Sequence, residues 1–464
     1  MKRTYIVDSL KSVGKKIKVC GWINSKRDHG SLLFIDLRDQ TGLLQVVFQK
    51  EVDQKLFSLA QKLTLESTLC IEGTIRERPK GTENPQIKTG RIEMIAEDLE
   101  VFSKAKTLPF PLEKATQVRE ELRLKYRYLD LRRKEMIETL RMRQKTVQFM
   151  RKFLQEKGFL EVETPLLGKS TPEGARDFLV PSRLHPGKFY ALPQSPQQYK
   201  QMLMVAGIER YFQIARCLRD EDPRADRQVE HTQLDIEMSF VSQEEILSLI
   251  EELYIKLVKE VFPTKKITNI PFIRMTYKEA MRRYKTDKPD LRRNKKDPDE
   301  LAFAFITDFP MFEWKKEEKR WGAMHHPFTK PQVQDIKKIK ESPESILAYQ
   351  YDFVLNGYEI GGGSLRTTDL EVLTAVFEVL GHKKEEIKKN FGHYFEAFSY
   401  GVPPHGGIAL GIERFLSIVL NKPSIREVIA FPKTGDGRDL LVGAPSEVEK
   451  KQLEELHIKI APFK

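Results

Sequence analysis

The sequence predicts an α+β protein with a small β-rich domain at the N-terminus and a larger domain of mixed helices and antiparallel strands. Three observations support this class. Residues 1–103 contain five short runs of alternating β-branched and aromatic residues. The first long helical pattern begins only at residue 133. The later strands are not spaced by regularly alternating helices, which argues against a βαβ arrangement. A chain of 464 residues has room for two or three domains with substantial cores.

The N-terminal domain, residues 1–103, is predicted to be a five-stranded barrel. A helical pattern over 52–63 separates the third strand from the fourth. Five strands with one helix fit the OB-fold, a barrel that commonly binds single-stranded oligonucleotides. A small β-barrel that binds no nucleic acid remains the alternative. The five predicted strands are KIKVCGWI, LLFIDLRD, LLQVVFQ, TLCIEGTIRER and RIEMIAEDLEVF.

A polar stretch with two prolines, residues 104–124, is predicted to be a hinge, and the larger domain then covers 125–464. The pattern over 133–157 predicts a long helix that ends at Gly158. A short strand follows and closes at Pro165. The polar, basic segment 285–300 is predicted to be a loop. The later predicted strands are KFYALP, YFQIAR, TQLDIEMSF, YDFVLNGYEIGGGS and GIALGI.

The composition is that of an ordinary globular protein with an excess of positive charge. Lys and Arg number 79 and Asp and Glu number 67, so the formal net charge is +12. This excess favours a polyanionic partner, although a solvated lysine-rich surface explains it equally well. The three cysteines have neither metal-ligand spacing nor an even number, so we expect buried thiols, no disulfide and a cytoplasmic location. We expect no membrane span.

Two arginines lie in settings suited to phosphate. Arg219 follows an apolar strand and opens a loop crowded with Arg, Asp and Glu, and a second strand, TQLDIEMSF, follows that loop. Arg414 lies where the small-residue strand GGIALGI runs into a helix. A guanidinium is a permanently charged planar fork that matches phosphate oxygens. A lone loop arginine more often forms a surface ion pair.

Eleven sequence blocks, in order along nearly the whole chain, resemble the bacterial-type aspartyl-tRNA synthetases, which are class II enzymes of subclass b. Single blocks carry little weight, since GGGS alone is also typical of a flexible turn. The blocks are DHGSLLFIDLRD, LRLKYRYLDLRR, TPEGARDFLVPSR, LPQSPQQYKQMLM, CLRDEDPRADRQ, DKPDLR, DFPMFE, HHPF, GYEIGGGSLR, PPHGGIALGIERF and IAFPKT. The resemblance implies a class II catalytic domain with an antiparallel sheet and an anticodon-binding OB-fold.

By this resemblance the enzyme joins L-aspartate to ATP and then transfers it to tRNA. Arg219 and Arg414 match the catalytic arginines of motifs 2 and 3, which neutralise phosphate charge. Attack on the α-phosphate needs positioning and charge stabilisation more than a protein base. The resemblance assigns ATP contacts to Arg219, Asp220, Glu221, Gln228, Glu359, Gly411, Ile412, Glu413 and Arg414.

Magnesium is expected beside the nucleotide, since it binds through a few carboxylates together with phosphate oxygens. Asp352 and Glu359 lie on a predicted strand pair and match the family's metal-binding positions. Two solvated acids on a hairpin are the alternative. The glycines at 361–363 favour the functional interpretation, because missing side chains allow close backbone approach.

Aspartate selection requires cations for the side-chain carboxylate and acids for the ammonium group. The resemblance gives the carboxylate to Arg366 and Lys200, and Asp235 orients Lys200. Glu173 contacts the ammonium group from a loop. Histidines in this region are also common as buried hydrogen-bonding residues. The remaining expected aspartate contacts are Arg219, Gln197 and His325.

The N-terminal barrel resembles the anticodon-binding domain of the family. Phe34 is expected to stack on an anticodon base, and Arg27, Gln45 and Glu93 to read base edges. The alternative for Phe34 is a place in the barrel core, since its strand alternates. His29 and Gly81 match positions that differ in relatives that also charge the asparagine tRNA. We therefore hypothesise that tRNA(Asn) is a partner besides tRNA(Asp).

The chain departs from the bacterial pattern in one large feature. Only about fifteen residues, Arg293 to Thr307, join two blocks between which bacterial relatives carry an inserted domain, so that domain is predicted to be absent. Pro165 matches the motif 1 proline at the subunit interface, which predicts a homodimer; an ordinary turn proline is the alternative.

The motifs leave two rival functions open. An asparaginyl or lysyl enzyme shares the motifs, but Lys200, Asp235 and Arg366 together favour a carboxylate substrate. A catalytically silent tRNA-binding relative has no need for Arg219 and Arg414.

Overall fold

A computed structural model describes residues 1–170, 176–222 and 226–461. The chain forms two compact units, Met1–Lys114 and Ala115–Lys464. Each unit is described by itself. In the described residues, no helix is both long and apolar enough to cross a bilayer.

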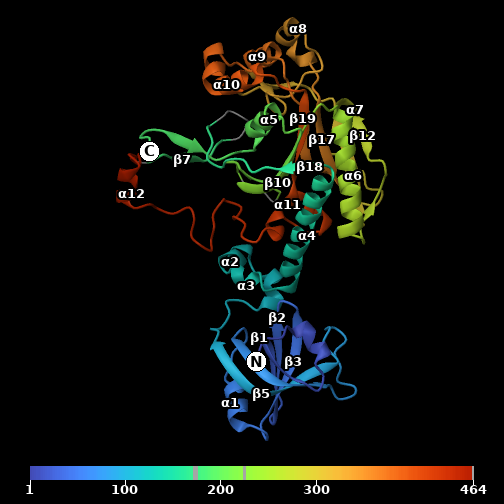
Figure 1. The fold of residues 1–464 in the computed structure, drawn as a ribbon, viewed down its shortest axis with the longest axis vertical. Helices are drawn as coiled ribbons and strands as arrows, with labels where there is room; N and C mark the ends of the chain where they lie inside the picture. The colour runs from blue at the N-terminus through green and yellow to red at the C-terminus, as the bar shows by residue number, and fades with distance from the viewer. Residues whose placement is uncertain (171–175, 223–225, 462–464) are drawn as a thin grey trace. The chain divides into compact units, whose positions relative to one another are not determined.

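The first unit is a closed five-stranded barrel in the order β1-β2-β3-β5-β4 (Figure 1). The helix α1 (Gln54–Gln61) lies between β3 and β4, and Asp53 caps it by accepting hydrogen bonds from two backbone amides. The predicted OB-fold barrel with one helix is therefore confirmed. The strands are β1 (Lys16–Asp28), β2 (Leu32–Asp39), β3 (Gly42–Gln49), β4 (Thr68–Glu77) and β5 (Ile92–Ser103), and a 3-10 helix, η1, covers Ile6–Lys11.

The alternation of β2 places its side chains on opposite faces of the barrel wall. Leu33 and Ile35 are fully buried in the core, whereas Phe34 is only half-buried and faces outward. The alternative interpretation, that Phe34 belongs to the barrel core, is therefore wrong.

The expectation of three free thiols and no disulfide fails in the barrel. Cys20 and Cys70 are register partners on β1 and β4, and the structure joins them in a disulfide that no spacing rule predicted.

The second unit is built on an eight-stranded sheet in the order β12-β14-β17-β18-β19-β10-β9-β6. Its five central pairings are antiparallel, and only the outer pairs β12·β14 and β6·β9 are parallel. The antiparallel α+β prediction is confirmed. The strands are β6 (Leu160–Glu161), β9 (Arg210–Leu218), β10 (Glu230–Ser239), β12 (Ile273–Thr276), β14 (Phe303–Thr307), β17 (Gln350–Leu355), β18 (Tyr358–Leu365) and β19 (His405–Gly411).

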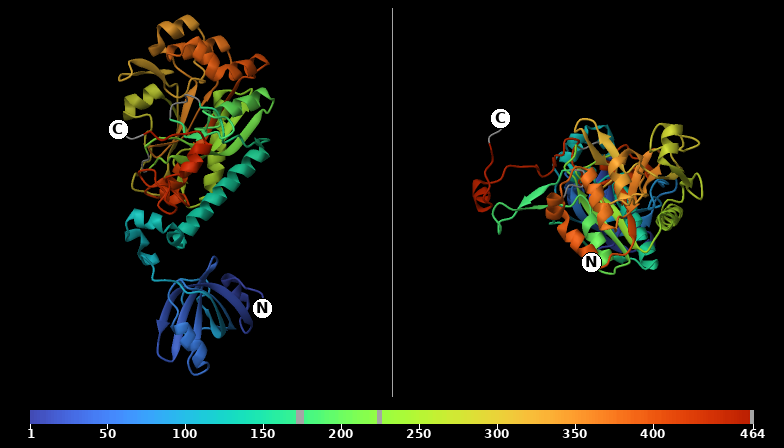
Figure 2. Two further views of the ribbon diagram at one scale, coloured as in Figure 1. Left: turned by 90° about the vertical axis from the view of Figure 1, so that its left-hand side faces the viewer. Right: turned by 90° about the horizontal axis from the view of Figure 1, so that it is seen from above.

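Two long helices cover one face of this sheet. The helices α4 (Lys134–Glu156) and α6 (Gln243–Val261) run side by side, and their apolar residues share one core with β10, β17 and β19 (Figures 1 and 2). A capping box at Ser242 and Glu245 starts α6. The helix predicted for 133–157 thus lies where expected, with Met150, Phe153 and Leu154 buried. The cavity described below lies over strands of the same sheet.

Shorter elements surround the sheet. The segment predicted as a hinge contains the 3-10 helix η2 and most of α2, and the segment 285–300 is free of helices, as predicted. The helices α8, α9 and α10 gather at one end of the unit (Figure 1). The remaining helices are η2 (Leu112–Gln117), α2 (Glu120–Lys125), α3 (Arg127–Asp130), α5 (Gln197–Val205), α7 (Tyr277–Tyr284), α8 (Ile336–Glu341), η3 (Pro343–Ser345), α9 (Leu370–Val379), α10 (Lys384–Ser399), α11 (Ile412–Val419), η4 (Ile425–Val428) and α12 (Lys450–Glu455).

Three two-stranded sheets complete the unit. Their strands are β7 (Leu179–Pro181) with β8 (Phe189–Ala191), β11 (Lys266–Ile267) with β13 (Glu300–Leu301), and β15 (Phe312–Lys315) with β16 (Arg320–Ala323).

Candidate active site

A cavity of about 370 Å³ lies over β9, β10, β18 and β19 of the second unit. Most of the predicted ATP and aspartate residues line it: Gln197, Lys200, Arg219, Glu221, Gln228, Asp235, His325, Glu359, Arg366, Gly411, Glu413 and Arg414. They come from segments more than 200 residues apart in the sequence, which the register of the sheet brings together.

Among the described residues, three of those predicted to bind ATP, aspartate or metal do not line the cavity. Ile412 is 1% exposed and packs in the core, so its side chain is unavailable to a nucleotide. Asp220 is half-exposed, and its backbone amide donates to the carbonyl of Arg176. Asp352 is buried just behind the wall. Glu173 lies outside the described residues.

One end of the cavity holds two buried cations. Lys200 on α5 contacts Asp235 Oδ1 at 2.7 Å and Glu237 Oε2 at 3.2 Å. Arg366, which follows β18, donates through Nε and Nη2 to the two oxygens of Glu237 at 2.8 and 2.9 Å. All four side chains are at most 2% exposed. Buried charges of this kind must be paired, because an unpaired charge loses its hydration.

Both cations keep N–H donors that take no hydrogen-bond partner within the part of the chain that the structure describes. The five N–H groups of Arg366 meet Glu237 twice, His326 at 2.7 Å and Ser364 at 2.6 Å, which leaves one. Lys200 has three N–H donors for two carboxylate partners. The buried Oδ2 of Asp235 has no partner among the described residues. The pocket can therefore receive a carboxylate between Lys200 and Arg366, beside an open acceptor.

The electrostatics of this end fix the charge states. Burial alone would raise the pKa of Glu237, but Arg366 and Lys200 lower it to about 2, so Glu237 is ionised. Burial and the nearby Arg366 lower the pKa of His325 to about 3. Burial and His325 also lower the pKa of His326, whose Nε2 accepts from Arg366. Both histidines are therefore neutral at pH 7.

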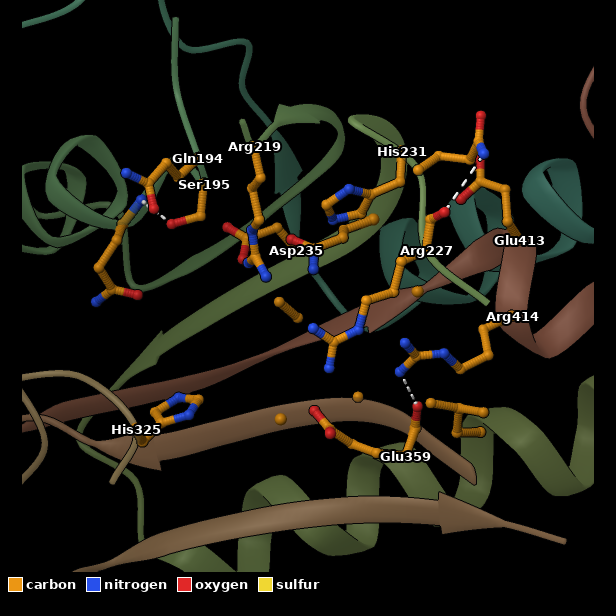
Figure 3. Close-up of a pocket in the computed structure, with 18 of the residues that line it drawn as sticks. Gln194, Ser195, Arg219, Arg227, His231, Asp235, His325, Glu359, Glu413 and Arg414 are labelled. Carbon is orange, nitrogen blue, oxygen red and sulfur yellow. Dashed lines mark hydrogen bonds between the residues drawn. The ribbon is translucent and has the colours of Figure 1, made fainter. Parts of the chain in front are cut away.

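The other end of the cavity is lined by guanidinium groups. Figure 3 shows Arg219, Arg227 and Arg414 converging on the centre of the cavity from three segments. Arg414 donates to the backbone oxygen of Glu359 at 2.5 Å and approaches Asp226 Oδ2 at 3.4 Å. The Nε atoms of Arg219 and Arg414 are buried without partners in the described part of the chain. Unsatisfied buried donors of this kind fit an anionic ligand.

Two predicted ATP contacts also hold the wall together. Glu413 accepts from Arg143 Nη2 at 2.7 Å and from the amide of Thr232 at 3.0 Å, so it ties α4 and β10 to α11. The amide oxygen of Gln228 accepts from the backbone of Lys433 at 3.0 Å.

The predicted metal carboxylates lie on the β17–β18 hairpin. A Cβ atom added at Gly362 would meet Asp352 Oδ1 at 3.3 Å, His325 Cε1 at 3.4 Å and Glu359 Oε1 at 3.6 Å, so these groups surround one point that glycine leaves open. Burial and the charge of Glu359 raise the pKa of Asp352 well above its ordinary value. Burial opposes the ionisation of Glu359, but Lys288 at 3.0 Å lowers its pKa overall.

The glycines on either side also meet a packing requirement of the sheet. A Cβ at Gly361 would approach Leu410 and the carbonyl of Ala409, and one at Gly363 would overlap the carbonyl of Gly407. These neighbours belong to β19, whose Ala409 also lines the cavity. Gly361 and Gly362 both line the cavity, and the space at Gly362 lies against the two carboxylates.

The four predicted anticodon residues share one face of the barrel wall, on which Gln45 and Glu93 are buried at 8% and 3% exposure. Arg27 is the register partner of Phe34, and its Nη2 donates to Gln45 Oε1 at 3.1 Å. Gln45 in turn donates to Glu93 Oε2 at 2.8 Å. This face therefore offers an aromatic ring beside a connected polar chain.

The two predicted discrimination positions lie in the connection between β1 and β2 and in the connection between β4 and β5. His29 packs edge-on against Phe34 with ring centroids 5.6 Å apart. Gly81 has φ +83° and no atom within 4 Å of an added Cβ, so a side chain there would strain the backbone without a clash.

Sequence reasoning missed several residues of both sites. Glu237, His326 and Arg227 line or support the cavity, and Lys288 contacts Glu359. On the barrel, Arg76 pairs with Glu93. Glu237 alone carried a usable signal, because it lies two residues after Asp235 on the same face of a strand.

Comparison with known proteins follows the same division into two parts. Residues 119–435 match the family described as tRNA synthetases class II (D, K and N), and residues 17–102 match the OB-fold nucleic acid binding domain. A relative from Caldanaerobacter subterraneus, named aspartate–tRNA(Asp/Asn) ligase, is 43% identical over 99% of this chain and 98% of its own. One of the same name from Thermodesulfovibrio yellowstonii is 42% identical over 97% of each chain.

Solved structures share the fold at lower identity. The asparaginyl-tRNA synthetase of Pyrococcus horikoshii superposes with a TM-score of 0.75 at 24% identity over 94% of this chain and 98% of that one. The aspartyl-tRNA synthetase of Entamoeba histolytica gives 0.73 at 23% over 93% and 91%.

The alignment with the first relative spans 589 positions, 125 more than the 464 residues of this chain, so that relative carries a stretch with no counterpart here. Together, the site and the family matches show that this chain belongs to the class II aminoacyl-tRNA synthetases of the D, K and N group and carries their OB-fold domain.

Proposed function

We propose that the protein is an aspartate–tRNA ligase that forms aspartyl-adenylate from L-aspartate and ATP and then transfers aspartate to the 3′ end of tRNA(Asp). The observation that carries this proposal is the pair of buried cations, Lys200 and Arg366, with spare donors facing the cavity. An amide or ammonium side chain would bring N–H groups against those donors, whereas a carboxylate accepts from both.

The remaining residues support adenylate formation by charge and position. Arg219 lines the cavity with a buried, unpaired Nε, so it could pair with the aspartate carboxylate or the α-phosphate of a bound nucleotide. Arg227 and Arg414, which point into the same cavity, would add positive charge for the outer phosphates. Positioning and preorganised charge are the main contributions that such a transfer needs from a protein. No neutral histidine is required as a base.

Magnesium fits the carboxylates present. Asp352 and Glu359 converge on the open space at Gly362, and the described residues contain no group of three acidic, histidine or cysteine side chains placed to hold a metal ion by themselves. Two carboxylates with phosphate oxygens and water are a typical magnesium environment. When bound, the ion would offset triphosphate charge.

The test is aspartate-dependent exchange of pyrophosphate into ATP. We expect exchange with aspartate and none with asparagine or lysine, which separates the asparaginyl and lysyl alternatives. No exchange with any amino acid would overturn the proposal in favour of a silent tRNA-binding protein.

We propose tRNA(Asn) as a second substrate. Support comes from the contact of His29 with Phe34 and from relatives named aspartate–tRNA(Asp/Asn) ligase. Aminoacylation of the two transcripts in parallel tests it. Charging of tRNA(Asp) alone would remove this part and leave the aspartate ligase intact.

We also propose a homodimer. Apolar side chains around β6 and the β7–β8 hairpin are more than half exposed in the single chain, among them Leu160 at 55%, Leu166 at 52% and Leu179 at 57%. Exposed apolar patches mark interaction surfaces, and Pro165 of the predicted motif 1 lies within this segment. Sedimentation should give twice the mass of the 54.0 kDa chain. A cytoplasmic location remains our expectation from the substrates.

A further inference from the structure

A lysine outside every predicted site contacts the acidic pair. Lys288 lies in the helix-free segment 285–300, and its Nζ is 3.0 Å from Glu359 Oε2. Both side chains are about one-third exposed, at 34% and 33%, so the contact lies at the edge of the cavity. Glu359 itself lines the cavity.

Without this lysine the acidic pair would have little compensation. Asp352 is 5% exposed, and its side-chain contact is a long one, 3.4 Å from Gln350 Nε2. Arg414 contacts Glu359 through the backbone oxygen rather than the carboxylate. Among the described residues, Lys288 is the cation that pairs with the Glu359 carboxylate. Two carboxylates around one point repel each other and any approaching triphosphate.

We propose that Lys288 is a built-in counter-ion of the Asp352–Glu359 pair, which occupies Glu359 before the metal–nucleotide complex binds and thereby sets the magnesium dependence of ATP binding. The inference rests on the proposed magnesium role of these two carboxylates. Lys288 is a positioning residue in this account, because it acts through Glu359.

Competition for one carboxylate predicts two effects of opposite sign. Without Lys288, metal-free ATP meets uncompensated carboxylates, so its affinity falls. Magnesium no longer has to displace an ammonium group, so the gain in ATP affinity on adding magnesium increases. A hydrogen bond to a charged group is worth enough for each effect to be on the order of tenfold. A lysine with a purely structural role would not lower the affinity for metal-free ATP and at the same time increase the gain in ATP affinity that magnesium gives.

The experiment measures ATP binding by calorimetry without aspartate, first in EDTA and then across a magnesium titration. The variants are Lys288→Met, Lys288→Arg, which keeps the charge, and Asp352→Asn, which removes one carboxylate. Lys296→Met is the matched control, because Lys296 is exposed in the same segment and lies eight residues away. Thermal unfolding of each variant checks the fold.

We expect Lys288→Met to weaken ATP binding in EDTA, to strengthen the magnesium effect and to lower the half-saturating magnesium concentration. Lys288→Arg and Lys296→Met should follow wild type. If magnesium raises ATP affinity equally in wild type and Lys288→Met, but not in Asp352→Asn, the counter-ion role of Lys288 is overturned and the metal site stands. A wild-type protein whose ATP binding ignores magnesium would overturn the metal site and the counter-ion together. If Lys288→Met fails to fold, Lys288→Arg becomes the test. The proposal is overturned if the magnesium dependence of ATP binding in Lys288→Arg differs from that of wild type.

Discussion

Replacing Arg366 by alanine should damage both stability and aspartate activation, and the two losses are separable. Arg366 is 2% exposed and donates to Glu237, His326 and Ser364 at 2.6–2.9 Å. The substitution removes every one of these contacts at once. Of its ion-pair partners among the described residues, Glu237, which is fully buried, would keep Lys200 at 3.2 Å.

The magnitude follows from the uncompensated charge. Removing one partner of a buried ion pair costs about 3–5 kcal/mol. The second unit, Ala115–Lys464, has about 350 residues, and an unfolding entropy of roughly 2.1 cal/mol/K per residue converts this loss to a fall in Tm of about 4–7 °C. Glu237→Gln in the Arg366→Ala background removes the stranded charge and should restore part of that fall.

The assay combines calorimetric unfolding with pyrophosphate exchange. Wild type, Arg366→Ala, Glu237→Gln and the double variant are compared at the same pH and salt. Arg366→Ala should show no aspartate-dependent exchange, while ATP still raises its Tm, because Arg219 and Arg414 do not contact Arg366. An unchanged Tm for Arg366→Ala, or no recovery in the double variant, would refute the buried-charge reasoning. Retained aspartate exchange would refute the role of Arg366 in binding aspartate.

Four further predictions concern separate parts of the molecule. Asp352→Asn should abolish the additional thermal stabilisation that magnesium gives to the ATP complex; a full magnesium effect would contradict the metal assignment. Burial and neighbouring arginines lower the pKa of His231 to about 3, so the unfolded chain binds the extra proton and stability falls as pH drops from 6.5 towards 3. His231→Phe should therefore lose less stability between pH 7.5 and pH 5 than wild type, and equal losses would be evidence against a neutral His231. Phe34→Ala should weaken tRNA binding on the order of tenfold, from the loss of one stacked base, with pyrophosphate exchange unchanged; filter binding tests this, and unchanged affinity would remove the stacking role. His29→Leu should reduce charging of tRNA(Asn) more than of tRNA(Asp), and parallel losses would show that position 29 does not discriminate.

The fold was predictable where local pattern and tertiary context agree. Alternation in the barrel strands predicted four of the five strands to within one residue at each end, because one face of each strand packs on the core. The first strand runs five residues beyond its predicted end at Ile23, and alternation alone left the face of Phe34 open. The helix ending before Gly158 was equally clear from its spacing and its terminal glycine. The Cys20–Cys70 pairing was not, because it depends on the register of β1 against β4.

The site residues inside family motifs were predictable from the sequence. The residues that support them through contacts with distant parts of the chain were not. Glu237 holds Arg366 from 129 positions away, a distance along the chain that no local pattern reports. Lys288 meets Glu359 only because a helix-free segment folds beside the β17–β18 hairpin. Conversely, Ile412 lies in the motif but points into the core, since a helix start presents only some of its side chains to a neighbouring cavity.

The measurement that most directly tests the central claim is aminoacylation of the tRNA(Asp) transcript, with radiolabelled aspartate, asparagine and lysine supplied separately alongside ATP and magnesium. The cation pair at Lys200 and Arg366 predicts transfer of aspartate alone. Transfer of asparagine or lysine in preference to aspartate, or no transfer of aspartate, would contradict it.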